Sequence, residues 1–209
     1  MMLEESYEGE VTRNNEIKNR KAEQARVRRN REKGLEFEER MFCRKSRHLV
    51  LFLTLNYKPK YREDVTLKTI QRHRDKFLDY MMADAHPLLG EINGLIWKLE
   101  EGRISGGLHL HFLIFYSGKR RGDVMIAMRL GEYWADIITR GWGAYRNSNA
   151  DKDRLEYRWG VGIGQVNRNL DPRRESLQLF IENYMAKSNQ VPSERTKHDK
   201  LFGTRDFDR

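Results

Sequence analysis

Hydrophobic residues along the chain gather in short runs, which are separated by polar segments rich in glycine or charge. Four runs have the length and composition of buried strands, and they cover residues 48–55, 92–100, 108–116 and 159–166. Helices are expected over about 65–83, 123–140 and 174–188, the first two from apolar residues at helical spacing. Residues 144–158 are polar and are expected to form a loop, and the tail after Pro192 is also polar.

The expected order is strand, helix, strand, strand, helix, strand, followed by one more helix. This order is typical of the ferredoxin-like split βαβ arrangement, an α+β fold with an antiparallel sheet and helices on one face. The second and third strands should form a hairpin through a turn-rich link at 101–107.

The N-terminal segment 13–33 is charged throughout and has too few apolar residues to form a stripe. We expect a solvated basic helix, or a partly disordered arm, that ends near Gly34 and binds nucleic-acid backbone. The domain division is then an N-terminal arm or linker at 1–45 and one folded domain at 46–209. The basic cluster expected to contact nucleic acid is Arg26, Arg28, Arg29, Arg31 and Lys33.

Composition narrows the function classes. The chain has 40 lysines and arginines against 31 acidic residues, a net charge of +9, which points to a polyanion and to nucleic acid before membrane. Cys43 is the only cysteine, which excludes an intrachain disulfide and a four-cysteine zinc site. The N-terminus does not resemble a signal peptide and the apolar runs are too short to span a bilayer, so we expect a cytoplasmic protein with no membrane partner.

Two histidines, His109 and His111, interrupt the most apolar strand. Side chains two apart in a strand leave the same face, so both imidazoles can reach one metal ion. Taken alone, such a pair is more often two satisfied sheet histidines. Glu100 ends the preceding strand and should lie beside them in a hairpin, whereas Glu101, the rival ligand, should point to the opposite face. Two imidazoles and a carboxylate with open positions suit Mn²⁺, and Mg²⁺ could complete its shell with water and substrate phosphate oxygens.

The third expected helix contains Tyr184 and Lys187, which are three residues apart and so share a helix face. An ordinary tyrosine has a pKa of about 10, and a nearby ammonium favours the phenolate, as an activated nucleophile requires. The same spacing also suits a packing face formed by Phe180, Ile181 and Tyr184.

Taken in order, three motifs resemble those of the HUH endonucleases. They are the Phe-Leu-Thr-Leu-Asn-Tyr strand at 52–57, the glutamate followed by His-x-His at 109–111, and the Tyr-x-x-Lys helix at 184–187. Within that superfamily the chain is similar to the single-tyrosine initiators of rolling-circle replication. Residues 96–100, 131–134 and 201–207 resemble the inovirus and prophage replication-protein family. The resemblance covers residues 46–207, and no second tyrosine lies near Tyr184, unlike in the two-tyrosine initiators.

The resemblance implies a metal-dependent nickase and ligase that acts on single-stranded DNA at a replication origin. Tyr184 would attack the scissile phosphate and hold it as a 5′-phosphotyrosine, with Lys187 assisting Tyr184 or holding a phosphate. His109, His111 and Glu100 would hold Mn²⁺ or Mg²⁺. A host helicase and polymerase would be partners, since no Gly-x-x-x-x-Gly-Lys phosphate-binding loop is visible.

Two alternatives stay open. One is a related single-tyrosine HUH transposase or relaxase, with the same chemistry on other DNA. The other is a non-catalytic ferredoxin-like nucleic-acid-binding protein, which would present exposed aromatic residues on its sheet in place of the two histidines and the glutamate.

Overall fold

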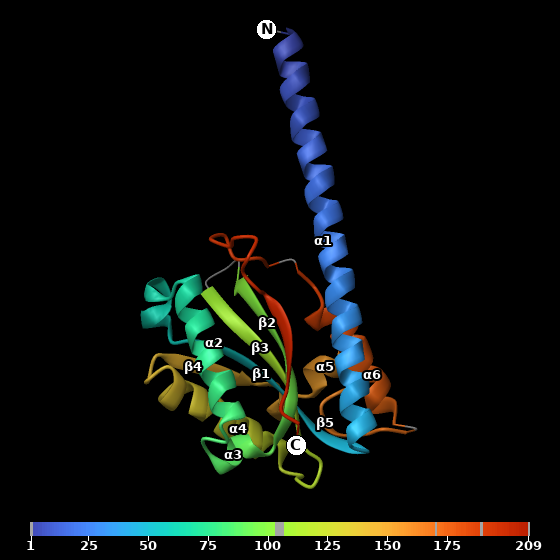
Figure 1. The fold of residues 1–209 in the computed structure, drawn as a ribbon, viewed down its shortest axis with the longest axis vertical. Coiled ribbons are helices and arrows are strands. Elements are labelled where there is room, and N and C mark those ends of the chain that lie inside the picture. Colours follow the sequence, from blue (N-terminus) through green and yellow to red (C-terminus); the bar gives the residue numbers. More distant parts are fainter. Residues whose placement is uncertain (1, 103–106, 170, 189, 209) are drawn as a thin grey trace.

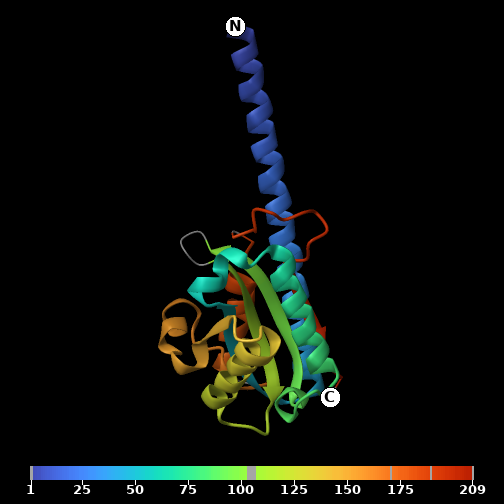
Figure 2. The same ribbon diagram turned by 90° about the vertical axis from the view of Figure 1, so that its left-hand side faces the viewer.

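The computed structural model describes residues 2–102, 107–169, 171–188 and 190–208. The chain forms an α+β fold with an open antiparallel sheet and helices on both of its faces (Figure 1 and Figure 2). The six strands are β1 (Arg47–Tyr57), β2 (Ile92–Gly102), β3 (Gly107–Ser117), β4 (Gly143–Asn147), β5 (Gly164–Asn167) and β6 (Phe202–Asp206). The α-helices are α1 (Met2–Arg44), α2 (Leu67–Met82), α3 (Pro87–Gly90), α4 (Asp123–Tyr133), α5 (Asp153–Trp159) and α6 (Pro172–Phe180).

The sheet has the order β4-β1-β3-β2-β6, and β5 pairs with the other end of β1. β3 lies between β1 and β2 and is antiparallel to both, which is compatible with the expected ferredoxin-like arrangement. The expected hairpin of β2 and β3 is confirmed, although residues 103–106 of its link lie outside the described residues.

Each face of the sheet packs against its own pair of helices, so the expectation of helices on one face is wrong. α2 and α4 cover one face, where Phe77 and Leu130 join the core formed with Phe112. The last turns of α1 and α6 cover the other face, where Phe37 and Phe180 join the second core. The central strands are apolar on both sides, as strands buried between two layers are.

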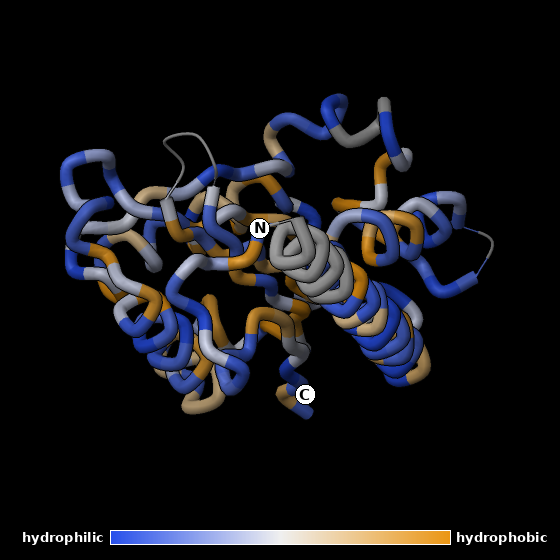
Figure 3. Tube along the Cα trace, turned by 90° about the horizontal axis from the view of Figure 1, so that it is seen from above, coloured by the Kyte–Doolittle hydropathy of each residue, from blue (hydrophilic) through white to orange (hydrophobic). Residues whose placement is uncertain are grey.

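α1 continues through Gly34 to Arg44, so the expected stop at Gly34 is wrong. Gly34 lies where the helix meets the sheet layer, and a Cβ there would come within 2.7 Å of Ile181 Cγ2, which explains the glycine. The earlier part of α1 projects away from the sheet, and most of the coloured length of this helix is hydrophilic (Figure 3). The change from exposed to packed thus falls within α1, before residue 45.

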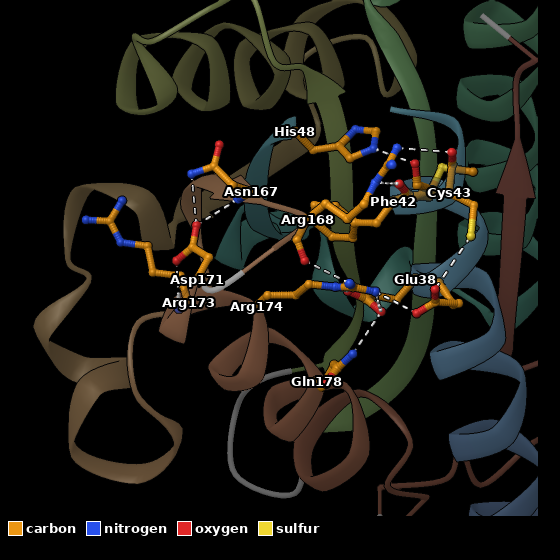
Figure 4. A network of polar contacts seen from close by, with 12 residues as sticks. Glu38, Phe42, Cys43, His48, Asn167, Arg168, Asp171, Arg173, Arg174 and Gln178 are labelled. Carbon is orange, nitrogen blue, oxygen red and sulfur yellow. Dashed lines mark hydrogen bonds and ion pairs between the residues drawn. The ribbon is translucent and has the colours of Figure 1, made fainter. Parts of the chain in front are cut away.

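Polar contacts hold the last turns of α1 against the start of α6 (Figure 4). The buried carboxylate of Glu38 accepts hydrogen bonds from Arg174 Nε at 2.8 Å and Gln178 Nε2 at 3.2 Å. Arg168 Nε donates to the carbonyl of Phe42 at 2.6 Å, which satisfies one of the free carbonyls at the end of α1. These contacts fix α1 and α6 side by side over the second core.

Several polar segments have more structure than expected. Residues 144–158, expected to form a loop, contain most of β4 and of α5, and the polar tail after Pro192 contains β6. The expected strand at 159–166 is largely wrong, because regular pairing begins only at Gly164.

α4 and α6 both end in a π-helical turn, Trp134–Ile138 and Ile181–Met185, a rare geometry often found at functional sites. None of the described helices has the length and apolar character needed to cross a membrane.

The packing of α1 generates a stability prediction. Phe37→Ala should lower the free energy of unfolding by about 3–5 kcal/mol, because Phe37 is fully buried between α1 and the sheet. Ile17→Ala is the matched control on the same helix, where the side chain is 46% exposed, and should change stability by less than about 0.5 kcal/mol. Urea unfolding of both variants measures the difference, and equal effects would contradict the packing of α1.

Candidate metal centre

The pairing of β2 with β3 places Glu100 opposite His109 and Lys98 opposite His111. The expected ligands are brought together: Glu100 Oε2 lies 3.0 Å from His111 Nε2 and 3.8 Å from His109 Nε2. One ligand atom from each of the three residues lies within 4.8 Å of the others. This group could hold a metal ion.

The other ring nitrogen of each histidine has its own partner. His109 Nδ1 donates to the carbonyl oxygen of Gly107 at 3.1 Å, and its Nε2 lies on the side of Glu100. His111 Nδ1 lies 3.2 Å from Thr54 Oγ1 on β1, within the 52–57 strand motif. Second contacts of this kind orient histidine ligands, so both Nε2 atoms fit the role of metal ligands.

The protonation states also fit a metal site. Burial lowers the pKa of His111 to about 4, although its hydrogen bond to Glu100 opposes this shift, so the ring is neutral at pH 7. Burial would raise the pKa of Glu100, but hydrogen bonds from His109 and His111 and the charge of Lys98 outweigh it and lower that pKa. The site therefore offers a neutral buried imidazole and a charged carboxylate.

Glu101, the rival ligand, has a different partner. Its Oε2 accepts a hydrogen bond from the backbone N–H of Ser193 at 2.7 Å, and it lies outside the three-residue group. The choice of Glu100 over Glu101 thus agrees with the geometry.

Lys98 is a site residue that the sequence reasoning missed. Its Nζ lies 3.0 Å from Glu100 Oε1, donates to the carbonyl of Tyr184 at 2.8 Å, and lies 4.4 Å from the centre of the Tyr184 ring. The residue is 3% exposed. A usable signal was present, because Lys98 stands two positions before Glu100 and is the one charged residue within the apolar run 94–99.

Tyr184 lies next to the candidate ligands. Its Oη is 3.4 Å from His111 Nε2, and its ring packs edge-on against His111 and stacks on Phe180. It belongs to the π-helical turn Ile181–Met185. Burial, followed by the negative charge of Glu100, raises the pKa of the phenol above its ordinary value, so the phenol is protonated at neutral pH.

Lys187 is placed differently from the sequence expectation. The helical turn ends at Met185, so Tyr184 and Lys187 do not share a regular helix face. Lys187 is exposed and lines a pocket with Lys98 and Glu100. Burial lowers the pKa of Lys98, Glu100 opposes this shift, and the charge of Lys187 adds to the lowering. A catalytic role for Lys187 stays a prediction.

The basic cluster on α1 divides into two groups. Arg26 contacts the body of the protein through Ser188, whereas Arg28 is exposed and lies 3.8 Å from Glu32 on its own helix. The side chains of Arg29, Arg31 and Lys33 are exposed. Contact of the cluster with nucleic acid stays a prediction.

Comparison of the chain with protein-family models, with curated proteins and with solved structures found no match.

The ligand geometry predicts which carboxylate matters for metal binding. Glu100→Gln and His111→Ala should each weaken Mn²⁺ binding on the order of a hundredfold, because the first removes the negative charge of a ligand and the second removes a ligand nitrogen. Glu101→Gln makes the same chemical change one residue away and should leave the affinity within about twofold. Calorimetric titration with Mn²⁺ measures all three, and an equal loss in the Glu101 variant would contradict the assignment.

Removing the charge of Lys98 should change the Mn²⁺ affinity in the opposite direction. Lys98→Met should tighten Mn²⁺ binding about tenfold, because it frees Glu100 Oε1 and removes a positive charge beside the site. Lys98→Arg keeps the charge and should not tighten it. The same titration applies, and weaker binding in the methionine variant would mean that Lys98 chiefly orients Glu100.

Proposed function

We propose that this protein is an HUH-type endonuclease that nicks and rejoins single-stranded DNA and thereby initiates rolling-circle replication. The observation that supports this best is the 3.4 Å approach of Tyr184 Oη to His111 Nε2, within a group of two histidines and a glutamate. A candidate nucleophile and a candidate metal site from distant parts of the chain thus meet at one place, as transesterification on a phosphodiester requires.

Glu100, His109 and His111 would hold the ion, either Mn²⁺, which accepts mixed nitrogen and oxygen ligands, or Mg²⁺. A divalent ion bound there would polarise the scissile phosphate and stabilise charge on the leaving 3′-oxygen. The protein's own part is to place the phenol of Tyr184 against that phosphate.

Tyr184 Oη attacks phosphorus in line, forming an oxygen–phosphorus bond as the bond to the 3′-oxygen breaks. The phenol loses its proton in this step, and the leaving 3′-oxygen gains one. Burial, followed by the charge of Glu100, opposes ionisation of the phenol, whereas the charges of Arg146 and Arg158 favour it. Because the phosphoester is retained as a 5′-phosphotyrosine, a free 3′-hydroxyl can reverse the step and rejoin the strand.

The covering of the sheet argues against the alternative of a non-catalytic nucleic-acid-binding protein. A ferredoxin-like binder that stacks bases on its sheet needs one open face with exposed aromatic residues. Here buried clusters cover both faces of the sheet, and the histidines and Glu100 gather at the end of one of them. This arrangement favours the enzyme, while a transposase or relaxase would differ only in the DNA it acts on.

The proposal predicts a tyrosine-dependent covalent product. Wild-type protein incubated with single-stranded origin candidates and Mn²⁺ should give a protein–DNA adduct on a denaturing gel, and excess chelator should abolish it. Tyr184→Phe should give no adduct while binding DNA within about threefold of wild type, because only the reacting oxygen is lost.

Tyr133→Phe is the matched control, since Tyr133 packs with the core on the opposite face of the sheet. It should give the adduct in normal yield. An adduct that forms in the Tyr184 variant, or in excess chelator, would refute the proposed chemistry.

A further inference from the structure

A pocket of about 140 Å³ lies beside Glu100, between three segments that are far apart in the sequence. The segments are the second half of α1, the end of β2 and the chain that follows α6, which lies near α1 in Figure 1. Four cationic side chains line this pocket, and Glu100 is the one carboxylate among its described lining residues. The four cations are Arg26, Lys98, Lys187 and Arg195.

The wall contributed by α1 is fixed to the wall opposite. Arg26 Nη1 donates to Ser188 Oγ at 3.1 Å, and Asn30 Nδ2 donates to the carbonyl of Ala186 at 3.2 Å. One face of the basic helix is therefore part of a built pocket, whereas Arg28 on the same helix faces solvent, its side chain 76% exposed.

Glu100 pairs with Lys98, and among the described lining residues no other carboxylate offsets the charges of Arg26, Lys187 and Arg195. Arg195 Nε is buried and has no hydrogen-bond partner there. Asp199 is affected by the charge of Arg195, but its carboxylate oxygens bond Gln71 and Thr196. Burial, and after it the charge of Arg195, lower the pKa of Arg26, as expected for two guanidinium groups brought close together.

A buried donor without a partner costs free energy, and native structures rarely keep one without a reason. An anion in the pocket would accept from the guanidinium of Arg195 and would screen the repulsion between Arg26 and Arg195. Guanidinium groups match the geometry of phosphate oxygens, and lysines add point charges to them.

We propose that this pocket binds one phosphate of the DNA backbone beside the candidate metal centre, a proposal that rests on the proposed function. Glu100 borders both the pocket and the candidate metal centre. A DNA strand with one phosphate in the pocket therefore has its neighbouring phosphodiester linkages close to Tyr184. Arg26 and Arg195 then position the strand, and neither touches the reacting atoms. A free phosphate ion offers the same chemistry, so the test separates the two sources.

The test measures binding of a short fluorescent single-stranded oligonucleotide of mixed sequence to the full chain in excess chelator, where no cleavage occurs. Arg26→Gln and Arg195→Gln should each weaken binding about tenfold. The matched controls Arg121→Gln and Lys197→Gln remove the same charge from exposed positions outside the pocket and should weaken it less than about twofold. Unfolding midpoints of all four variants exclude loss of the fold as the cause.

A double variant tests whether the two arginines share one phosphate. If they do, the loss in Arg26→Gln/Arg195→Gln is smaller than the product of the single losses, because the second change removes a contact already weakened by the first. Losses that multiply, or losses equal to those of the controls, would overturn the proposal.

Inorganic phosphate, titrated by calorimetry, separates the two sources. If wild-type protein binds inorganic phosphate and Arg195→Gln abolishes this binding but leaves the oligonucleotide affinity unchanged, the pocket holds a small anion. That result would overturn the DNA assignment. Adduct formation by wild-type protein is scored separately, so a failed pocket and a failed endonuclease give different results.

Discussion

The register between β2 and β3 is the constraint on which the site depends. Side chains alternate along a strand, so a slip of one residue would turn Glu100 and Lys98 to the other face, away from both histidines. The register is held by burial on both sides of the sheet, because a slip would also exchange Leu95 and Ile96 between two different cores. The chemistry of the site and the packing of the fold are thus set by the same pairing.

Much of the central sheet and the three candidate ligands could be predicted from the sequence, because apolar runs mark buried strands and a hairpin fixes neighbours. The elements that the sequence does not predict are those whose local pattern of apolar and polar residues is weak. β4 and β6 are short, polar strands at the edge of the sheet, and they form only because β1 and β2 offer unpaired backbone. The continuation of α1 past Gly34 is set by tertiary contacts of Phe37 and Glu38 that no local spacing reveals.

The helix that contains Tyr184, the candidate nucleophile, shows a different limit of prediction from sequence. The sequence predicts Tyr184 as a candidate nucleophile from its place in a late helix, and regular helix geometry predicts that Tyr184 and Lys187 share a face. The π-helical turn Ile181–Met185 inserts an extra residue into the turn and ends the helix early, with the N–H of Ala186 donating to the carbonyl of Ile181. Lys98 therefore lies against the Tyr184 ring, while Lys187 faces the pocket beside it.

The chain after α6 also shields the outer edge of β2. Phe202 to Asp206 pair with residues 94–98, Leu99 N–H donates to the carbonyl of Leu201, and Glu101 N–H donates to the carbonyl of Gln190. An open strand edge is a template for pairing with another chain, and natural sheets cover or disrupt such edges. By occupying the edge of the strand that holds Glu100, the C-terminal segment keeps two copies of the protein from joining sheet to sheet at this strand.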